Sequence, residues 1–350
     1  MKHNAIEVKN PIVDGLAFIL SWGTFNDDYQ RSVTPISKRI KKATDDGVIE
    51  RKFFRGSRYR ESFNIQLSGD EPVLVQIGAI QPNSQKGGIR VELNPAKFQP
   101  GDVDFFHETM KRIIGKRYLS LMENPSVNVI HCAVDIVGAN LDRTLVAYTN
   151  AQRYTIFGKR FDAQAHIEGY NFGSVSSDYM TAVYEKDVER VHRALLRLLK
   201  QKRETDPLKS NVVKQFLNNK SGQQELRVEV RGKKLRGLPL YKISDLTNRF
   251  ERFAFCDLFS DGTELPSYIE ESFLALCRQN GVKAALETFK HTEWVRKVNA
   301  YYRSRNATWW HPDDMWKQAC DSLRGTGLFP DSAFVEPKYR VHDDSDRPFK

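Results

Sequence analysis

The sequence predicts an α+β fold with a largely antiparallel sheet and helices packed on one of its faces, followed by an α-helical C-terminal region. Three observations predict this class. Residues 12–232 contain about eight strand-like runs and two helical patterns. The helices follow blocks of strands instead of alternating with them one for one, which disfavours a parallel sheet. Beyond about residue 245 the apolar spacing becomes helical.

The first half of the chain supplies most of the expected sheet. Four apolar runs bounded by turn residues predict strands at 15–23, 72–80, 88–94 and 127–138. The glycine-containing loop between the second and third of these runs predicts a hairpin. Residues 102–122 carry apolar side chains at helical spacing, and Asp102 or Asp104 is the expected N-cap.

The second half continues the sheet and then changes character. Further strands are expected at 153–159, 165–173, 178–186 and 225–232, and an amphipathic helix at 188–202. Four helical patterns follow, at 267–281, 282–291, 293–305 and 312–325. The first two pivot on Gly281 and form a candidate helix–turn–helix, although two helices around a glycine also occur in many bundles. We therefore expect three regions, at 1–245, 246–335 and a polar tail at 336–350.

Composition excludes several classes of protein. Among the 350 residues, 40% are hydrophobic and 11% are aromatic, which excludes a disordered or fibrous chain. The four cysteines form no CxxC pair, so neither a disulfide framework nor a zinc ribbon is expected, and the simplest location is the reducing cytoplasm. No apolar run long enough for a membrane span and no signal peptide are recognisable, so no membrane is expected. Walker, GxGxxG, GxSxG and HUH motifs are absent from the sequence.

Positive charge is concentrated in two segments. The chain carries a formal net charge of +10, and residues 201–250 alone hold twelve Lys or Arg against five Asp or Glu. In the second segment, 38–60, the sequence RKFFRGSRYR places aromatic residues between cations. Arginines neutralise phosphates and aromatic rings stack on unpaired bases, so this composition suits single-stranded nucleic acid. The alternative is an exposed hairpin whose aromatic residues pack onto the core. The candidate DNA-binding residues are Arg51, Lys52, Arg55, Arg58, Arg227, Arg231, Lys233 and Lys234.

Alternation along the expected strands groups polar residues by face. Asp135 lies in an apolar run, where a carboxylate is costly unless it is paired or binds a metal. Arg227, Glu229 and Arg231 share one face of the strand at 225–232. Tyr184 shares a face with Lys186, whereas Glu185 lies on the other face.

A sheet face of this kind has two interpretations. Two carboxylates can hold Mg²⁺ or Mn²⁺, a neighbouring cation can stabilise a phosphodiester, and a tyrosine oxygen can attack phosphorus. The other interpretation is an ordinary solvated face with cross-strand Glu–Arg pairs. His131 is interpreted as a strand residue rather than a ligand, because the eight histidines are scattered.

Three segments, in this order, resemble a known family. They are HCAVDIVGAN at 131–140, YNFGSVSSDYMTAVYEKD at 170–187 and LRVEVRG at 226–232. The middle one, with Gly-Ser-x-x-Ser, a strand and Tyr-x-Lys, resembles the hallmark of the plasmid and filamentous-phage replication initiation factor family. VDGLAFIL at 13–20 is similar to that family's first strand. The resemblance covers roughly residues 12–260 and implies a fold like that of HUH endonucleases, without the HUH histidines.

The resemblance implies a nicking–closing endonuclease that starts rolling-circle replication. A tyrosine would cleave one origin strand and stay attached to its 5′ phosphate. Carried over by motif, Tyr184 is the nucleophile, with Tyr179 ranked second, and Lys186 is the phosphate-stabilising cation. Asp135 and Glu229 are the expected ligands of Mg²⁺ or Mn²⁺, with Glu185 and Glu92 as weaker candidates. The implied partners are double-stranded origin DNA, single-stranded DNA and a host helicase, and a homodimer is left open.

Two other functions remain open at this point. One is a repressor or origin-binding protein that keeps the fold without the chemistry. The other is a related tyrosine transesterase that acts in transposition or phage integration. The nicking hypothesis requires Asp135, Tyr184, Lys186 and Glu229 to converge within about 10 Å on one sheet face.

Overall fold

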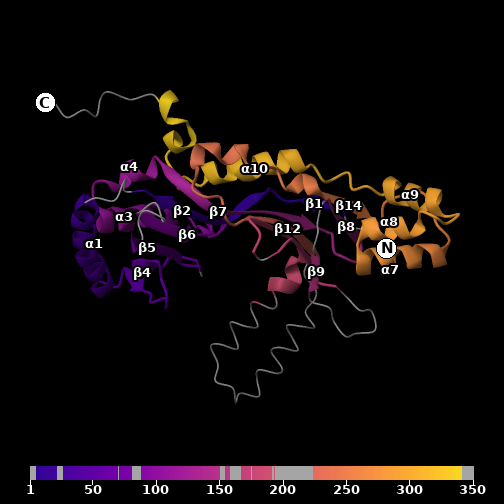
Figure 1. The fold of residues 1–350 in the computed structure, drawn as a ribbon, viewed down its shortest axis with the longest axis horizontal. Coiled ribbons are helices and arrows are strands. Elements are labelled where there is room, and N and C mark those ends of the chain that lie inside the picture. The colour runs from indigo at the N-terminus through magenta and orange to yellow at the C-terminus, as the bar shows by residue number, and fades with distance from the viewer. Residues whose placement is uncertain are drawn as a thin grey trace, which may run out of the picture. The chain divides into compact units, whose positions relative to one another are not determined.

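The computed structural model describes residues 5–21, 27–69, 71–80, 88–149, 154–157, 167–174, 176–190, 193 and 224–340. The chain forms two compact units, each assembled from separate stretches (Figure 1). Unit one comprises residues 1–11, 133–230 and 248–316, and unit two comprises residues 12–132, 231–247 and 317–350. The expected division at residue 245 stays a prediction.

The sheet of unit two is built from antiparallel neighbours. Its strands are β2 (Ile12–Leu20), β3 (Ile49–Arg51), β4 (Tyr59–Ile65), β5 (Val73–Ala79), β6 (Ile89–Leu93) and the first part of β7 (Pro125–Val137). Their order in space is β3-β4-β5-β6-β2-β7. The pairs β3–β4, β4–β5, β5–β6 and β2–β6 are all antiparallel, and β13 (Leu238–Pro239) pairs antiparallel with the start of β7. The expected hairpin of β5 and β6 is thus confirmed.

Helices and a set of apolar side chains complete the described part of the core of unit two, to which most of α10 (Pro312–Gly325) also belongs. The helices are α1 (Asp27–Asp45), α3 (Asp102–Ile114) and α4 (Tyr118–Met122), with the short turns η1 (Pro95–Lys97), η2 (Leu240–Asp245), η4 (Asp331–Phe334) and η5 (Pro337–Tyr339). Ile36 and Ile40 lie one turn apart on α1 and are fully buried. Phe18 of β2 packs edge-on against Phe329, with ring centroids 4.9 Å apart.

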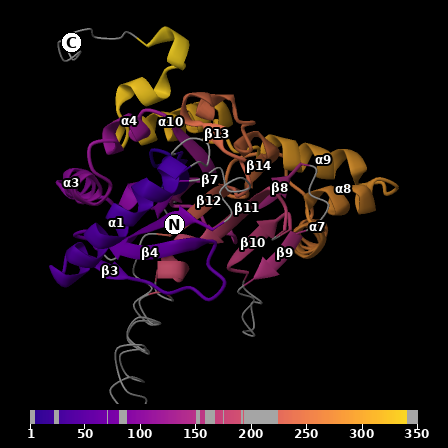
Figure 2. The ribbon, with the colours of Figure 1, turned by 60° about the vertical axis from the view of Figure 1, so that its left-hand side comes forward.

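Unit one continues from the second part of β7. Its strands follow the order β7-β12-β11-β10-β9, with β12 at Glu225–Gly232, β11 at Tyr179–Glu185, β10 at Gly169–Phe172 and β9 at Tyr154–Phe157. β1 (Glu7–Val8) pairs antiparallel with the end of β7. A separate two-stranded sheet joins β8 (Thr144–Tyr148) to β14 (Phe253–Asp257). Figure 2 shows β9 and β10 beside α7 (Ser267–Asn280), where the Tyr154 hydroxyl donates to the Gln279 carbonyl at 2.9 Å.

The helices α7, α8 (Val282–Phe289) and α9 (Val295–Ser304) surround a second apolar core in unit one. Unit one also contains the short turn η3 (Phe250–Arg252). Phe273, Val298 and Tyr301 are fully buried in this core together with Cys256. Burial raises the pKa of the Cys256 thiol to about 12, so this cysteine is an apolar packing residue. All four cysteines are free, as the composition predicts. The last long helix is α10 (Pro312–Gly325).

The α+β class and the large antiparallel sheet are confirmed, and several elements differ from expectation. The helix expected at 102–122 stops at Gly115, which has a φ of 90°. Gly101 occupies its N-cap position, because the Asp102 carboxylate instead accepts hydrogen bonds from the backbone N–H groups of Ser68 and Gln99. The strand β14 lies in a region expected to be helical.

Other expectations fall partly outside the described residues. Of the helix expected at 188–202, residues 188–190 and 193 are described, and they are helical. The end of the polar tail, residues 341–350, lies outside them as well. Within the described part of the chain, no helix is both long and apolar enough to cross a membrane.

Candidate functional site

The hydroxyl of Tyr184 and the carboxylate of Glu229 meet across two neighbouring strands of unit one. Tyr184 lies near the end of β11 and Glu229 in the middle of β12. The Tyr184 hydroxyl donates to Glu229 Oε2 over 3.4 Å. Tyr184 is 7% exposed and Glu229 is 4% exposed. A carboxylate at this position can orient the hydroxyl and accept its proton.

Lys186 brings a cation to the same tyrosine. It follows β11 directly, at the first position of a helical segment. Its Nζ lies 5.7 Å from the centre of the Tyr184 ring and 3.0 Å from Glu189 Oε2. Burial lowers the pKa of Lys186 below its usual 10.5, the positive charge of Arg227 lowers it further, and Glu189 acts in the opposite direction. The chain thus holds a partly desolvated ammonium group beside the tyrosine, where it can stabilise charge on a phosphate.

Arg227 and Asp135 form a bidentate ion pair on β12 and β7. Arg227 Nε donates to Asp135 Oδ1 at 2.5 Å, and a terminal guanidinium nitrogen donates to Oδ2 at 2.6 Å. Both oxygens of Asp135 are therefore engaged, which disfavours the metal-ligand role expected from the sequence. Arg227 is 7% exposed, so it is a buried partner of Asp135 rather than a surface contact for DNA. The pair is a cross-strand carboxylate–arginine pair, but it contains Asp instead of Glu and is largely buried instead of solvated.

The two remaining candidate ligands lie outside the Tyr184 cluster. Glu185 points to the opposite face of β11, as the alternation predicts, and accepts a hydrogen bond from the backbone N–H of Leu141 at 3.4 Å. Glu92 belongs to unit two and forms an ion pair with Arg90 at 2.6 Å. The predicted set Asp135, Glu229 and Glu185 therefore does not assemble as one group of ligands. Glu229 is its one member hydrogen-bonded to Tyr184 in the described residues.

A histidine interpreted as an ordinary strand residue lies close to a carboxylate in unit two. One ligand atom each of Asp14, on β2, and His131, on β7, lie within 4.8 Å of each other. Imidazole and carboxylate are both metal ligands, imidazole mainly for Zn²⁺, Cu²⁺, Fe²⁺ and Ni²⁺ and carboxylate mainly for Mg²⁺, Ca²⁺ and Mn²⁺. The sequence signal was available, because Asp14 is a carboxylate inside the apolar strand at 12–20.

Tyr179, the second candidate nucleophile, has a different environment. The guanidinium of Arg249 lies 4.5 Å from the centre of its ring. Burial raises the pKa of Tyr179 above its usual value, and the charge of Arg249 opposes this rise. The described residues of the Gly-Ser-x-x-Ser motif form a turn between β10 and β11, in which the Ser177 hydroxyl donates to the Ser174 carbonyl at 2.6 Å. This turn sets the start of the strand that carries both tyrosines.

Phe157 of β9 lies close to Tyr184, across Gly169 of the intervening strand β10. Gly169 of β10 is the cross-strand partner of Tyr184 on one side and of Phe157 on the other. A Cβ at Gly169 would overlap the Phe157 ring, so glycine is required there by the close approach of the ring. The centroids of Phe157 and Tyr184 lie 6.4 Å apart. The Phe157 ring therefore packs on the backbone of Gly169, where no side chain intervenes, next to the candidate nucleophile Tyr184.

The candidate DNA-binding residues of segment 51–60 lie on and beside a loop between β3 and β4. Arg51 pairs with Glu61, and Lys52 lies 2.5 Å from Glu50. Phe53 is 89% exposed and Phe54 is 49% exposed. The expectation that these aromatic residues pack onto the core is thus wrong for Phe53. Of the other predicted contacts, Lys234 is exposed, and Arg231 and Lys233 are partly exposed; their role stays a prediction.

The chain has few recognisable relatives among the known proteins with which it was compared. No family model matches the chain, and no curated protein matches it. A solved structure that resembles the chain is the rolling circle replication initiator protein from Geobacillus stearothermophilus. The TM-score is 0.31 and the identity 12%, over 79% of this chain and 99% of that chain. At that TM-score the likeness does not establish a shared fold.

Proposed function

We propose that the protein nicks and rejoins one strand of DNA through Tyr184, as an initiator of rolling-circle replication. The observation that carries the proposal is the contact of the Tyr184 hydroxyl with Glu229 at 3.4 Å, with the Lys186 ammonium 5.7 Å from the ring. A nucleophile, a proton acceptor and a cation are the three groups that transfer of a phosphodiester to tyrosine requires. The sequence resemblance of segments 131–140, 170–187 and 226–232 supports the same reaction.

In this reaction the Tyr184 oxygen attacks the phosphorus of a DNA phosphodiester. A bond forms between the tyrosine oxygen and phosphorus, and the bond from phosphorus to the 3′ oxygen breaks. The hydroxyl proton passes to Glu229, and the leaving 3′ oxygen takes up a proton from water. Lys186 stabilises negative charge on the non-bridging phosphate oxygens. In the reverse step a 3′ hydroxyl attacks the phosphotyrosine and restores the phosphodiester.

Mg²⁺ or Mn²⁺ remains part of the proposal as a cofactor. A divalent cation neutralises charge on a phosphodiester that is being cleaved. Among the ligands expected from the sequence, we propose Glu229 for this role because it lies beside Tyr184, whereas both oxygens of Asp135 are held by Arg227. Origin DNA, in double-stranded and single-stranded form, and a host helicase are the proposed partners.

The second candidate function is DNA binding without cleavage. Tyr184 is 7% exposed and packs near Phe157, so a DNA strand reaches its hydroxyl only if neighbouring groups move. Such burial also fits a protein that keeps the fold and has lost the chemistry. Covalent attachment to DNA distinguishes the two functions.

The test is formation of a covalent adduct. Supercoiled plasmids that carry the DNA flanking the gene are incubated with the protein and Mg²⁺ or Mn²⁺, and the products are separated under denaturing conditions. We expect a nicked plasmid with protein attached to the 5′ phosphate. Tyr184→Phe should abolish the adduct and leave DNA binding unchanged, and Tyr179→Phe is the matched control. An adduct that survives in Tyr184→Phe and is lost in Tyr179→Phe would reassign the nucleophile.

A further inference from the structure

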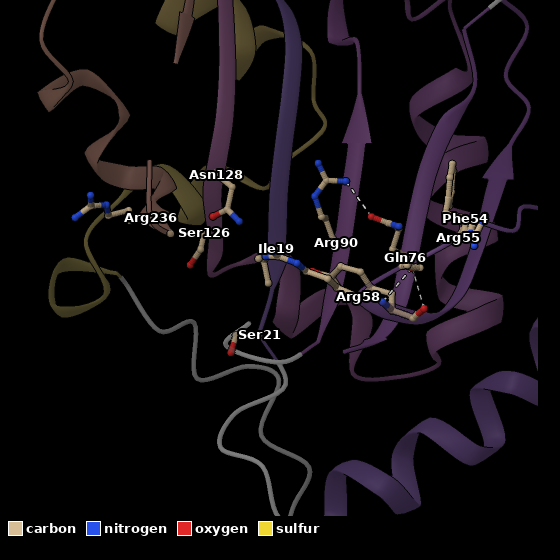
Figure 3. A pocket seen from close by; sticks show the side chains of 14 residues that line it. Ile19, Ser21, Phe54, Arg55, Arg58, Gln76, Arg90, Ser126, Asn128 and Arg236 are labelled. Carbon is tan, nitrogen blue, oxygen red and sulfur yellow. Dashed lines mark hydrogen bonds between the residues drawn. The ribbon is translucent and has the colours of Figure 1, made fainter. Parts of the chain in front are cut away.

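A cavity of about 690 Å³ opens in unit two, on residues separate from the Tyr184 cluster. Its walls come from the end of β2, from the loop between β3 and β4, from the middle of β5 and the start of β6, and from the start of β7 with the turn before β13. Figure 3 shows Arg55 and Phe54 on one side, and Asn128 and Arg236 on the other. The volume lies within the range of roughly 300–1,000 Å³ that is usual for ligand sites.

The lining of this cavity is strongly basic. Arg55, Arg58, Arg90 and Arg236 contribute to it, and none of the described lining residues is acidic. Arg90 donates to Gln76 at 3.0 Å (Figure 3). It also forms an ion pair with Glu92 at 2.6 Å. Guanidinium groups bind phosphate oxygens in a bidentate manner, so a lining of four arginines selects a ligand with more than one phosphate or a polyanion.

Aromatic and amide groups in the same cavity favour a nucleic acid over a simple polyanion. Phe54 lines the cavity and is half exposed, and the neighbouring Phe53 is almost fully exposed. Exposed aromatic rings beside arginines are the usual platform for unpaired bases. Asn128 lines the cavity from β7, and its buried Oδ1 makes no hydrogen bond to any described residue. A buried acceptor without a partner is costly, which is consistent with a polar ligand group that contacts this amide when bound.

Arg236, which lines the cavity, has a left-handed backbone conformation. Arg236 has a φ of 54°, the one positive value among the described residues other than glycine, and Gly237 follows with a φ of 76°. The backbone N–H of Leu235 donates to the Asn128 carbonyl at 3.0 Å, which ties this turn to β7. A left-handed conformation is uncommon for arginine, and such conformations cluster at functional sites.

We propose that this cavity binds a segment of single-stranded DNA, with a base stacked on Phe54 and phosphates held by Arg55, Arg58 and Arg236. The inference rests on the proposed function only for the choice of DNA as the nucleic acid. The cavity holds the strand, whereas the Tyr184 cluster carries the chemistry. Its role is therefore separable from cleavage.

Binding of a short fluorescein-labelled single-stranded DNA, followed by anisotropy at several salt concentrations, tests the proposal. Arg55→Ala combined with Arg236→Gly removes two charges, and glycine also tolerates the left-handed backbone at 236. We expect this double variant to bind at least 10-fold more weakly and to reduce the slope of log K against log salt by about 1.4. Lys41→Ala, which removes an exposed cation outside the cavity, is the control and should change affinity less than about twofold.

Phe54→Ala separates stacking from charge. We expect it to weaken binding by roughly 5- to 150-fold with an unchanged salt slope, because it removes a stacking surface and no charge. Wild-type affinity in both the double variant and Phe54→Ala would overturn the proposal. Equal or tighter binding of an RNA of the same sequence, or of inorganic triphosphate at comparable concentration, would overturn the assignment to DNA.

Single-strand binding and nicking are measured independently, so the two proposals can fail separately. If the wild type forms no adduct but the cavity variants lose single-strand binding, the cavity proposal is supported and the proposed cleavage is rejected. Adduct formation by wild type, together with full single-strand binding by the cavity variants, supports the cleavage and rejects the cavity.

Discussion

Arg227 holds both carboxylate oxygens of Asp135 in a pair that is largely withdrawn from water. The pair joins β12 to β7 within unit one and also places a positive charge near Lys186, where it lowers the pKa of that ammonium group. Asp135 thus acts on the Tyr184 cluster indirectly, by fixing the position of a neighbouring cation. Removing the Asp135 carboxylate would leave the buried Arg227 guanidinium without the ion pair that it forms in this structure.

The first prediction concerns the stability of this pair. Asp135→Ala should lower the free energy of unfolding by about 3–5 kcal/mol, because it strands a buried guanidinium. The measurement is urea denaturation followed by circular dichroism. Glu50→Ala, which breaks the exposed pair with Lys52, is the control and should cost less than about 1 kcal/mol. Similar losses in the two variants would mean that the Asp135 pair is solvated in solution.

The second prediction concerns the contact between Gly169 and Phe157. Gly169→Ala should destabilise the protein by about 1–3 kcal/mol, because the new methyl group overlaps the Phe157 ring. Phe157→Ala in the same chain should recover most of that loss, since it removes the overlapping ring. A double-mutant cycle on thermal unfolding measures the coupling. Additive effects would show that the ring does not pack on Gly169.

The third prediction concerns pH and Lys186. Because the pKa of Lys186 is lowered in the folded protein, the unfolded chain binds more protons between that lowered value and the usual 10.5. Stability should therefore rise with pH across this window, relative to Lys186→Met, and the gain is complete above 10.5. The measurement is the difference in unfolding free energy between wild type and variant at a series of alkaline pH values. A difference that is flat with pH would place Lys186 in water.

The faces of the strands were predictable from the sequence, and the partners across them were not. A period of two puts Tyr184 on one face of β11 and Glu185 on the other, and the structure keeps that order. The period of two does not indicate that β11 lies next to β12, because Tyr184 and Glu229 are 45 residues apart in the sequence. Nor does it identify the partner of Asp135, because burial of a carboxylate fits an arginine as well as a metal.

The elements missed from the sequence share short length or mixed pattern. β8 and β14 have five residues each, and a short apolar run does not distinguish a strand from a buried turn of helix. α1 carries Pro35 in its interior and many charged residues, so its apolar side is narrow. The cavity of unit two combines residues from six separate stretches of chain, of which the sequence analysis singled out only the loop at 51–60.

The last prediction separates Glu229 from Glu185, the glutamate on the opposite face of β11. Glu229→Gln should slow adduct formation by roughly 10²- to 10⁴-fold, because the amide cannot accept the Tyr184 proton. Glu185→Gln is the matched control: it keeps an oxygen acceptor for the Leu141 N–H on the opposite face of β11 and should cleave within a few-fold of wild type. Single-turnover adduct formation on denaturing gels measures both rates, with circular dichroism to confirm folding. If Glu185→Gln lost as much activity as Glu229→Gln, the proton acceptor would lie on the other face of the sheet.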